Sequence, residues 1–200
     1  GVLFDKTQTE LIQYPAGSDE TTYTIPNSVT LIGDNAFQGS GLKYLGVTSD
    51  SPLQTTDADG DGTVDVTIGS VQTIGGKDVY VYYTSKTLFI DTSDNEYLID
   101  INGEITSSDY PDGITVNNLK SVVLGTNVQT IGNYAFNGCT KLESVTVAPT
   151  NDEFKTISTY AFQECTSLES ITIPNNVETI GNYAFNGCPK LESVTLPTND

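Results

Sequence analysis

One short sequence recurs along the chain, and it restricts the fold more than any other feature. Its last copy, IPNNVETIGNYAFNGCPKLESVT, spans residues 173–195; two close copies span 128–146 and 154–172, and a more distant one spans 25–47. The Ala-Phe pair of the close copies begins at residues 135, 161 and 184, which gives steps of 26 and 23 residues. A period near 23 residues is typical of solenoids, in which each copy forms one coil of a stack.

The apolar positions of the repeat explain why the coils should stack. Each copy ends in a period-two strand pattern, in which Val194 and Leu196 point inward and the residues between them point outward. A single coil cannot bury its apolar residues, whereas identical stacked coils bury like on like. We therefore expect Phe136, Phe162 and Phe185 to stack in register and to be almost fully buried.

Three cysteines occupy one slot of the repeat, at Cys139, Cys165 and Cys188. Equivalent side chains of stacked coils point in parallel, which disfavours a disulfide even where the Cα atoms approach within the usual range of about 4.4–6.8 Å. We predict buried free thiols, which behave as small apolar groups.

The motif V-x-x-I-G-x-x-A-F-x-x-C-x-x-L-x-x-V-x-I-P resembles the BspA-type leucine-rich repeat of bacterial surface proteins. The resemblance covers about 100 residues through the four copies, and the copy at 25–47 departs from it with Ser40 in the Cys slot and one residue deleted. It implies a right-handed α/β solenoid with a parallel concave sheet, and an extracellular or cell-surface location. It further implies adhesion or protein binding and no enzymatic activity.

The chain order predicts a single solenoid over residues 1–200. We expect an N-terminal β-hairpin cap at 1–24, a first repeat at 25–47, an insertion loop with degenerate β-rich coils at 48–113, and regular repeats at 114–200 that stop between coils. Two echoes favour degenerate coils over an inserted subdomain: SVQTIGG at 70–76 resembles NVQTIGN at 127–133, and LFIDTSDNEYLID at 88–100 resembles LFDKTQTELIQ at 3–13. Both matches are short, so the two alternatives stay open.

Charge and composition exclude several functions. The chain carries 26 acidic and 8 basic residues, a net charge of −18, and no His; all the basic residues are Lys. Without a basic stripe we expect no nucleic-acid partner, and without His there is no Ser-His-Asp or Cys-His catalysis. No apolar run is long enough for a membrane span. The absence of Met leads us to expect that a signal peptide has been removed.

One acidic stretch departs from the repeat, at residues 57–65 (DADGDGTVD). Its carboxylates stand at positions 1, 3, 5 and 9 with Gly at position 6, a spacing that can wrap a hard cation. It differs from an EF-hand because position 12 is Ile68, and it resembles the nine-residue calcium loop of FG-GAP repeats. The alternative is a solvated Asp-Gly turn. The candidate calcium ligands are Asp57, Asp59, Asp61, the Thr63 carbonyl and Asp65.

The outward face of the strands is the candidate ligand surface. Small and hydroxyl side chains recur there, and a solenoid face of this kind suits a protein or glycan ligand, although strand propensity alone also favours Thr at such positions. The candidate residues are Tyr44, Ser121, Val123, Ser144, Thr146, Ser170, Thr172, Ser193 and Thr195. The sequence thus predicts a surface binding module, with a structural stalk or spacer for another domain as the alternative.

Overall fold

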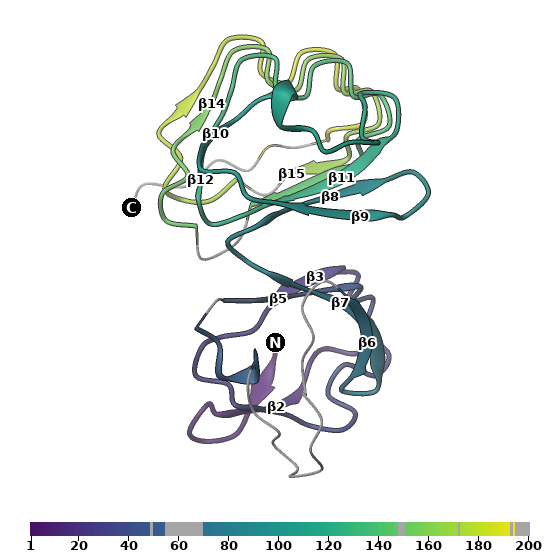
Figure 1. The fold of residues 1–200 in the computed structure, drawn as a ribbon, viewed down its shortest axis with the longest axis vertical. Helices are drawn as coiled ribbons and strands as arrows, with labels where there is room; N and C mark the ends of the chain where they lie inside the picture. Colours follow the sequence, from purple (N-terminus) through teal and green to yellow (C-terminus); the bar gives the residue numbers. More distant parts are fainter. Residues whose placement is uncertain (49, 55–69, 148–150, 172, 193, 195–200) are drawn as a thin grey trace. The chain divides into compact units, whose positions relative to one another are not determined.

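The computed structural model describes residues 1–48, 50–54, 70–147, 151–171, 173–192 and 194 (Figure 1). The chain divides into two compact units, Gly1–Thr84 and Ser85–Asp200, which together hold about six β-solenoid turns. The boundary between the units falls inside the segment 48–113, and one continuous solenoid over residues 1–200 stays a prediction.

Helix is scarce in the described part of the chain. It is limited there to two short 3-10 helices, η1 (Pro52–Gln54) and η2 (Ser107–Asp109). The predicted solenoid is confirmed, but the predicted α/β class is not, because consecutive turns form the stretch around each Ala-Phe pair. None of the helices described is long and apolar enough to cross a membrane.

The first unit consists of two small sheets that enclose one apolar core. The core includes Leu11, Phe37 and Leu45, all fully buried. One sheet has the order β1-β2-β4 and the other β3-β5-β7-β6. The strands are β1 (Leu3–Phe4), β2 (Glu10–Gln13), β3 (Thr22–Thr24), β4 (Leu31–Ile32), β5 (Tyr44–Val47), β6 (Ser70–Ile74) and β7 (Lys77–Tyr83).

The hairpin predicted at the N-terminus is present. Strands β1 and β2 pair antiparallel, and β2 then pairs parallel with β4 of the first repeat. The carboxylate of Asp5 holds the hairpin turn, where it accepts hydrogen bonds from the backbone N–H groups of Thr9 at 2.7 Å and Glu10 at 2.9 Å. The conformation of the turn therefore depends on the Asp5 carboxylate and its hydrogen bonds from the backbone.

The echo at residues 70–76 does not form a coil like its counterpart at 127–133. Strand β6 pairs antiparallel with β7 as a hairpin, whereas β12 pairs parallel with strands of neighbouring coils. Gly75 and Gly76 cause the difference, since both have positive φ, at 55° and 74°. Two such residues are what a tight two-residue hairpin turn requires. Residue 133, where the second glycine would fall in the later copy, is Asn.

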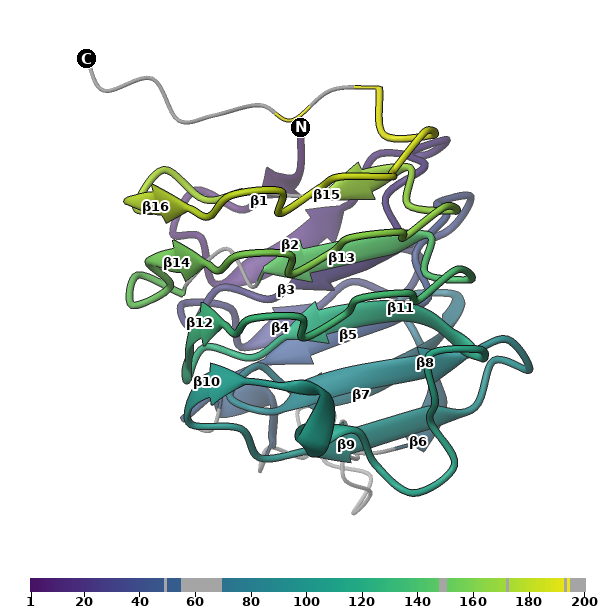
Figure 2. The same ribbon diagram turned by 90° about the horizontal axis from the view of Figure 1, so that it is seen from above.

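The second unit also has two sheets, which run along a stack of coils. Figure 2 shows β12, β14 and β16 above one another on one side, with β11, β13 and β15 on the other. The sheet orders are β10-β12-β14-β16 and β15-β13-β11-β8-β9. The strands are β8 (Thr87–Asp91), β9 (Glu96–Ile99), β10 (Gly103–Ile105), β11 (Leu119–Leu124), β12 (Val128–Ile131), β13 (Ser144–Val147), β14 (Thr156–Ile157), β15 (Ser170–Ile171) and β16 (Thr179–Ile180).

The stack begins before residue 114, where the sequence predicts the regular repeats. Ile105 of β10 lies opposite Ile131 of β12, so a degenerate coil already pairs with the regular ones. Counting from these isoleucines, Tyr110 takes the place of Phe136, and its ring stacks on that phenylalanine at 6.0 Å. The Tyr110 hydroxyl donates to the Ala135 carbonyl at 2.8 Å. Tyr110 thus covers the beginning of the phenylalanine stack and satisfies a backbone acceptor.

The predicted phenylalanine ladder forms the core of this unit. The ring centroids of Phe136 and Phe162 lie 5.2 Å apart, those of Phe162 and Phe185 lie 5.3 Å apart, and the planes of each pair are within 5°. Phe136 and Phe162 are fully buried, as predicted. The prediction is wrong for Phe185, which is only partly buried, because no later coil among the described residues covers it.

Asparagine side chains tie each coil to the coil before it. The amide of Asn151 donates to the carbonyl oxygens of Gly125 at 3.0 Å and Val128 at 2.8 Å, and this side chain is buried. In the next coil the amide of Asn176 donates to three backbone carbonyls, among them that of Phe154 at 2.8 Å. Such bonds satisfy carbonyls at turns that no strand can reach.

Candidate functional site

The predicted calcium loop lies outside the described residues. All five candidate ligands belong to the segment 55–69, namely Asp57, Asp59, Asp61, Thr63 and Asp65. Elsewhere, in the described ranges, no group of three or more His, Cys, Asp or Glu side chains is placed to hold a metal ion. The calcium site therefore rests on its sequence.

The predicted serine row forms on three parallel strands. Ser121 of β11 lies opposite Ser144 of β13, which lies opposite Ser170 of β15. The side chains of Ser121 and Ser144 are half-buried, and that of Ser170 is exposed. Thr146, paired with Val123, is also half-buried. Thr172, Ser193 and Thr195 lie outside the described residues.

Two predicted ligand-binding residues are buried. Val123 is 4% exposed and Tyr44 is 8% exposed. Tyr44 packs its ring edge-on against Tyr80, with the ring centroids 6.5 Å apart. Burial removes both side chains from the surface that a ligand can touch. Of the predicted surface, the described residues that keep solvent exposure are the three serines and Thr146.

An exposed tyrosine ladder was not predicted from the sequence. The rings of Tyr134 and Tyr160 stack at 5.0 Å, those of Tyr160 and Tyr183 at 5.2 Å, and Tyr134 and Tyr183 are 52% and 62% exposed. Each of the three residues has φ of 58°, a backbone conformation that side chains with a Cβ rarely adopt. The signal was present in the sequence, because Tyr precedes the Ala-Phe pair in each close copy.

The three cysteines are free, as predicted, and Cys139 and Cys165 are buried. The prediction of burial is wrong for Cys188, which is only partly buried. The thiols of Cys165 and Cys188 donate to the carbonyls of Phe136 and Phe162, each at 3.1 Å. Burial raises the pKa of the Cys139 thiol to about 11. A thiol with so high a pKa is protonated at neutral pH, which makes Cys139 a packing group and a poor nucleophile.

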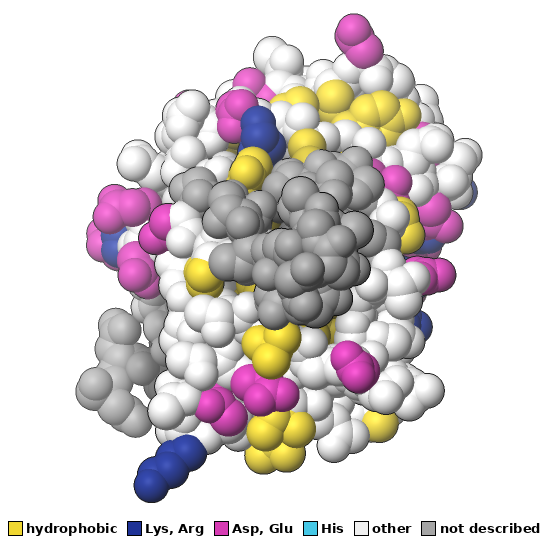
Figure 3. Space-filling model, turned by 60° about the horizontal axis from the view of Figure 1, so that its bottom comes forward, with side chains coloured by type: hydrophobic (Ala, Val, Ile, Leu, Met, Phe, Trp, Pro, Cys, Tyr) yellow, Lys and Arg dark blue, Asp and Glu magenta, His cyan; other side chains and the backbone are white. Residues whose placement is uncertain are grey.

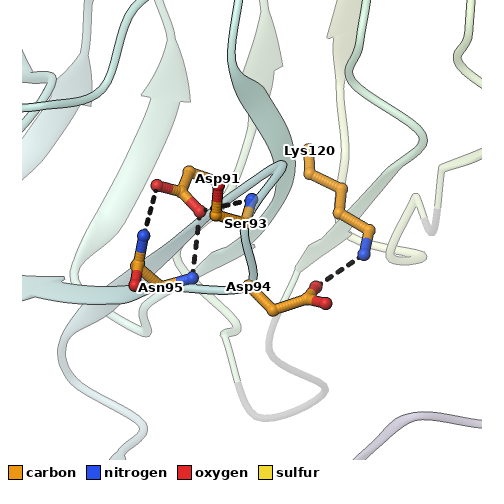
Figure 4. A network of polar contacts seen from close by, with 5 residues as sticks. All are labelled: Asp91, Ser93, Asp94, Asn95 and Lys120. Atoms are coloured by element: carbon orange, nitrogen blue, oxygen red, sulfur yellow. Dashed lines mark hydrogen bonds and ion pairs between the residues drawn. The ribbon is translucent and has the colours of Figure 1, made fainter.

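A second acidic turn joins β8 to β9 (Figure 4). The carboxylate of Asp91 accepts hydrogen bonds from the backbone N–H groups of Ser93 at 2.8 Å and Asn95 at 2.9 Å, and from the Asn95 side chain at 2.8 Å. The bond from the Asn95 side chain is the largest cause that lowers the pKa of Asp91. Asp94 pairs with Lys120 of β11 at 2.6 Å. Both carboxylates have partners within the chain, so the turn is structural.

A cavity opens on the first unit beside β2. Its volume is about 350 Å³, and it is lined by residues of β2 and of the turn that follows β4. The lining contains two carboxylates, those of Glu10 and Asp34, and the apolar side chain of Ile12. No lysine lines it.

A family model described as BspA type leucine rich repeat region matches residues 16–56 and 115–200, in 6 copies. No curated protein matches the chain. Among solved structures, the chain is similar to the pneumococcal vaccine antigen PcpA, with 20% identity, a TM-score of 0.38, and coverage of 96% of this chain and 42% of that one.

Two further similar structures are leucine-rich repeat proteins. The one from Eubacterium ventriosum shares 18% identity with a TM-score of 0.25, over 97% of this chain and 50% of that one. The one from Bacteroides ovatus shares 17% identity with a TM-score of 0.29, over 91% and 39%. The chain thus spans half or less of the length of each of these three structures.

Proposed function

Since the chain belongs to the BspA-type leucine-rich repeat family, we propose that it is a non-enzymatic binding module of the cell surface. It recognises a protein partner, and its task is adhesion. The in-register row of Ser121, Ser144 and Ser170 carries this proposal, because parallel strands present a regular line of small polar side chains. Repeat solenoids bind partners along such extended faces.

Several features support binding rather than catalysis. The chain has no His, the Asp91 carboxylate accepts hydrogen bonds from the backbone of its own turn, and the Cys139 thiol is protonated at neutral pH. A network of serine and threonine hydroxyls offers hydrogen bonds in both directions, which suits a polar interface. A glycan is a further candidate ligand for the same face, because its hydroxyl groups form the same kind of hydrogen bond.

The experiment is a binding assay with the whole chain immobilised and purified extracellular-matrix proteins as analytes. Saturable binding to at least one of them is expected. Ser144→Arg places a bulky charged side chain in the middle of the row, so it should weaken that binding by at least about tenfold. The matched control is Thr140→Arg, an exposed turn residue of the same coil, which should bind as the wild type does.

The second candidate function is a stalk or spacer that displays another domain. The regular coil stack favours it, because ring stacking and strand pairing repeat from coil to coil and give a rigid rod its length. A stalk predicts no saturable binding to any protein of the panel. With either function, we propose that the solenoid winds right-handed and that the hairpin at residues 3–13 caps it.

We also propose that residues 57–65 bind calcium. The support is their sequence: four carboxylates in nine residues repel one another unless a cation compensates them. A calcium-stabilised loop suits a protein outside the cell, where sites with dissociation constants of about 10⁻⁴–10⁻³ M are filled. This location also agrees with the proposed surface function.

A further inference from the structure

The outward face of the sheet β1-β2-β4 carries exposed apolar side chains. Leu3, Ile12 and Leu31 are 53%, 43% and 43% exposed. They face outward because their strand neighbours Phe4, Leu11 and Ile32 pack into the core of the first unit. These three aliphatic side chains lie on three adjacent strands of one sheet, where a partner that packs on this face would bury them.

An acidic cavity borders this apolar face. Glu10 lies opposite Leu31 in the strand register, and a Cβ built on Gly33 would lie 3.9 Å from the Glu10 Oε1 atom. The Glu10 carboxylate therefore lies close to Gly33, which also lines the cavity, and Asp34 follows Gly33 in the lining. The described residues of the lining include two carboxylates and no lysine, a formal charge of −2 among them.

The size and charge of the cavity together define its occupant. A volume of about 350 Å³ is near the lower end of ligand cavities, which hold about 300–1,000 Å³, so it suits one or two side chains. The chain as a whole is acidic, with 26 acidic against 8 basic residues, and Figure 3 shows acidic groups spread over the visible face among few lysines. A net negative charge attracts basic groups, and the two carboxylates of the lining offer a counter-charge to one of them.

We propose that this face docks a segment of a partner protein that inserts an Arg or Lys side chain between Glu10 and Asp34. In the partner segment, the apolar residues that flank this Arg or Lys pack against Ile12 and Leu31. Arg fits best, because its planar fork donates to a carboxylate in two places and is weakly hydrated. The inference rests on the proposed binding function and adds to the serine row a second surface, on the first unit, with its own partner chemistry.

The test is an NMR titration of the isotope-labelled whole chain with the peptide acetyl-Leu-Arg-Leu-amide. The expected shifts are in the amides of Glu10 and Asp34 and in the methyl groups of Ile12 and Leu31. Acetyl-Leu-Gln-Leu-amide, which lacks the cation, should bind at least about tenfold more weakly, and raising NaCl from 0.05 to 0.5 M should weaken the Arg peptide several-fold.

Matched variants separate the cavity from general acidity. The double variant Glu10→Gln/Asp34→Asn keeps the side-chain shapes and should weaken the Arg peptide by at least about tenfold. The double variant Asp19→Asn/Glu20→Gln removes the same charge from an exposed stretch of the unit and should bind as the wild type does. Preserved amide dispersion in each variant shows that the fold is intact.

Three results overturn the inference: equal affinity for the Arg and Gln peptides, unchanged affinity of Glu10→Gln/Asp34→Asn, or shifts confined to residues outside this face. The matrix-protein assay distinguishes its failure from that of the proposed function. If Glu10→Gln/Asp34→Asn binds a matrix protein as tightly as the wild type does, the cavity is not the docking site and the binding function still stands.

Discussion

Truncating Phe162 to Ala tests the stacked-coil core. The ring is fully buried between Phe136 and Phe185, with centroid distances of 5.2 and 5.3 Å. Phe→Ala changes in cores cost about 3–5 kcal/mol, and the cost is highest where the surroundings cannot collapse. Because hydrogen-bonded coils on both sides keep the space left by the Phe162 ring from collapsing, we expect the free energy of unfolding to fall by about 4–5 kcal/mol.

The measurement should report on this part of the chain alone, because two compact units need not unfold in one transition. Amide hydrogen exchange followed by mass spectrometry gives the free energy of opening for peptides within residues 128–190. Phe185→Ala is the matched control, since its ring is only partly buried and stacks on Phe162 alone among the described rings.

Phe185→Ala should therefore destabilise these coils by at least about 1–2 kcal/mol less than Phe162→Ala does. Phe162→Leu, which keeps much of the volume, should cost roughly 1–1.5 kcal/mol. Equal losses in Phe162→Ala and Phe185→Ala would refute the reasoning, because they would mean that the ring between two coils is no better packed than the ring at the end.

Four further changes test other parts of the account. Glu164→Gly should raise stability by about 0.5–1 kcal/mol in a thermal melt, because φ of 59° strains Glu where the neighbouring coils have Gly; no gain would contradict this. Asn151→Ala should lower the free energy of unfolding by about 2–3 kcal/mol in denaturant, because two carbonyls lose their donor. A loss under 0.5 kcal/mol would mean that the asparagine bonds between coils do not stabilise the stack. Hydrogen bonds lower the pKa of Asp91 below 3.8, so the melting temperature of Asp91→Ala should fall below that of the wild type at pH 7 and approach it as the pH drops below 3.8; a difference unchanged at pH 2 would be inconsistent with this linkage. Calcium at a hundredfold excess over Kd should add roughly 2.7 kcal/mol that magnesium and Asp61→Ala do not reproduce, and equal melting temperatures in EDTA, calcium and magnesium would reduce the loop to an acidic turn.

The coil stack was predictable because the repeat fixes the partner of each residue. When copies of one sequence stack, like residues meet, so the rings of Phe136 and Phe162 and the free thiols of the cysteines followed from the spacing alone. The prediction was wrong for Phe185. Its burial requires a following coil, and the repeat pattern does not show whether one packs on it.

Short echoes predicted less reliably than the full repeat. The echo of residues 3–13 at 88–100 has the same structure, since both segments form antiparallel hairpins whose turns are held by an Asp carboxylate. The echo at 70–76 does not, because Gly75 and Gly76 turn the chain back on itself. Two adjacent glycines outweigh five matching residues, since they decide the backbone direction.

The candidate surface was predicted in its position but not in its exposure. Alternation along the strands placed Ser121, Ser144 and Ser170 in one row, and the register confirms that alignment. Alternation cannot tell which outward positions other groups cover, and Val123 and Tyr44 are buried. The tyrosine ladder was not predicted, because residue propensities disfavour exposed aromatic residues at positive φ.

Recognition through the serine row is tested by comparing two dissociation constants for the tightest-binding matrix protein. Ser144→Arg disrupts the serine row, and Thr140→Arg adds the same side chain to a turn of the same coil. The account predicts that Ser144→Arg weakens binding by at least about tenfold while Thr140→Arg stays within about twofold of the wild type. Equal affinities for the two variants, or no saturable binding of the wild-type chain, would contradict recognition through this face.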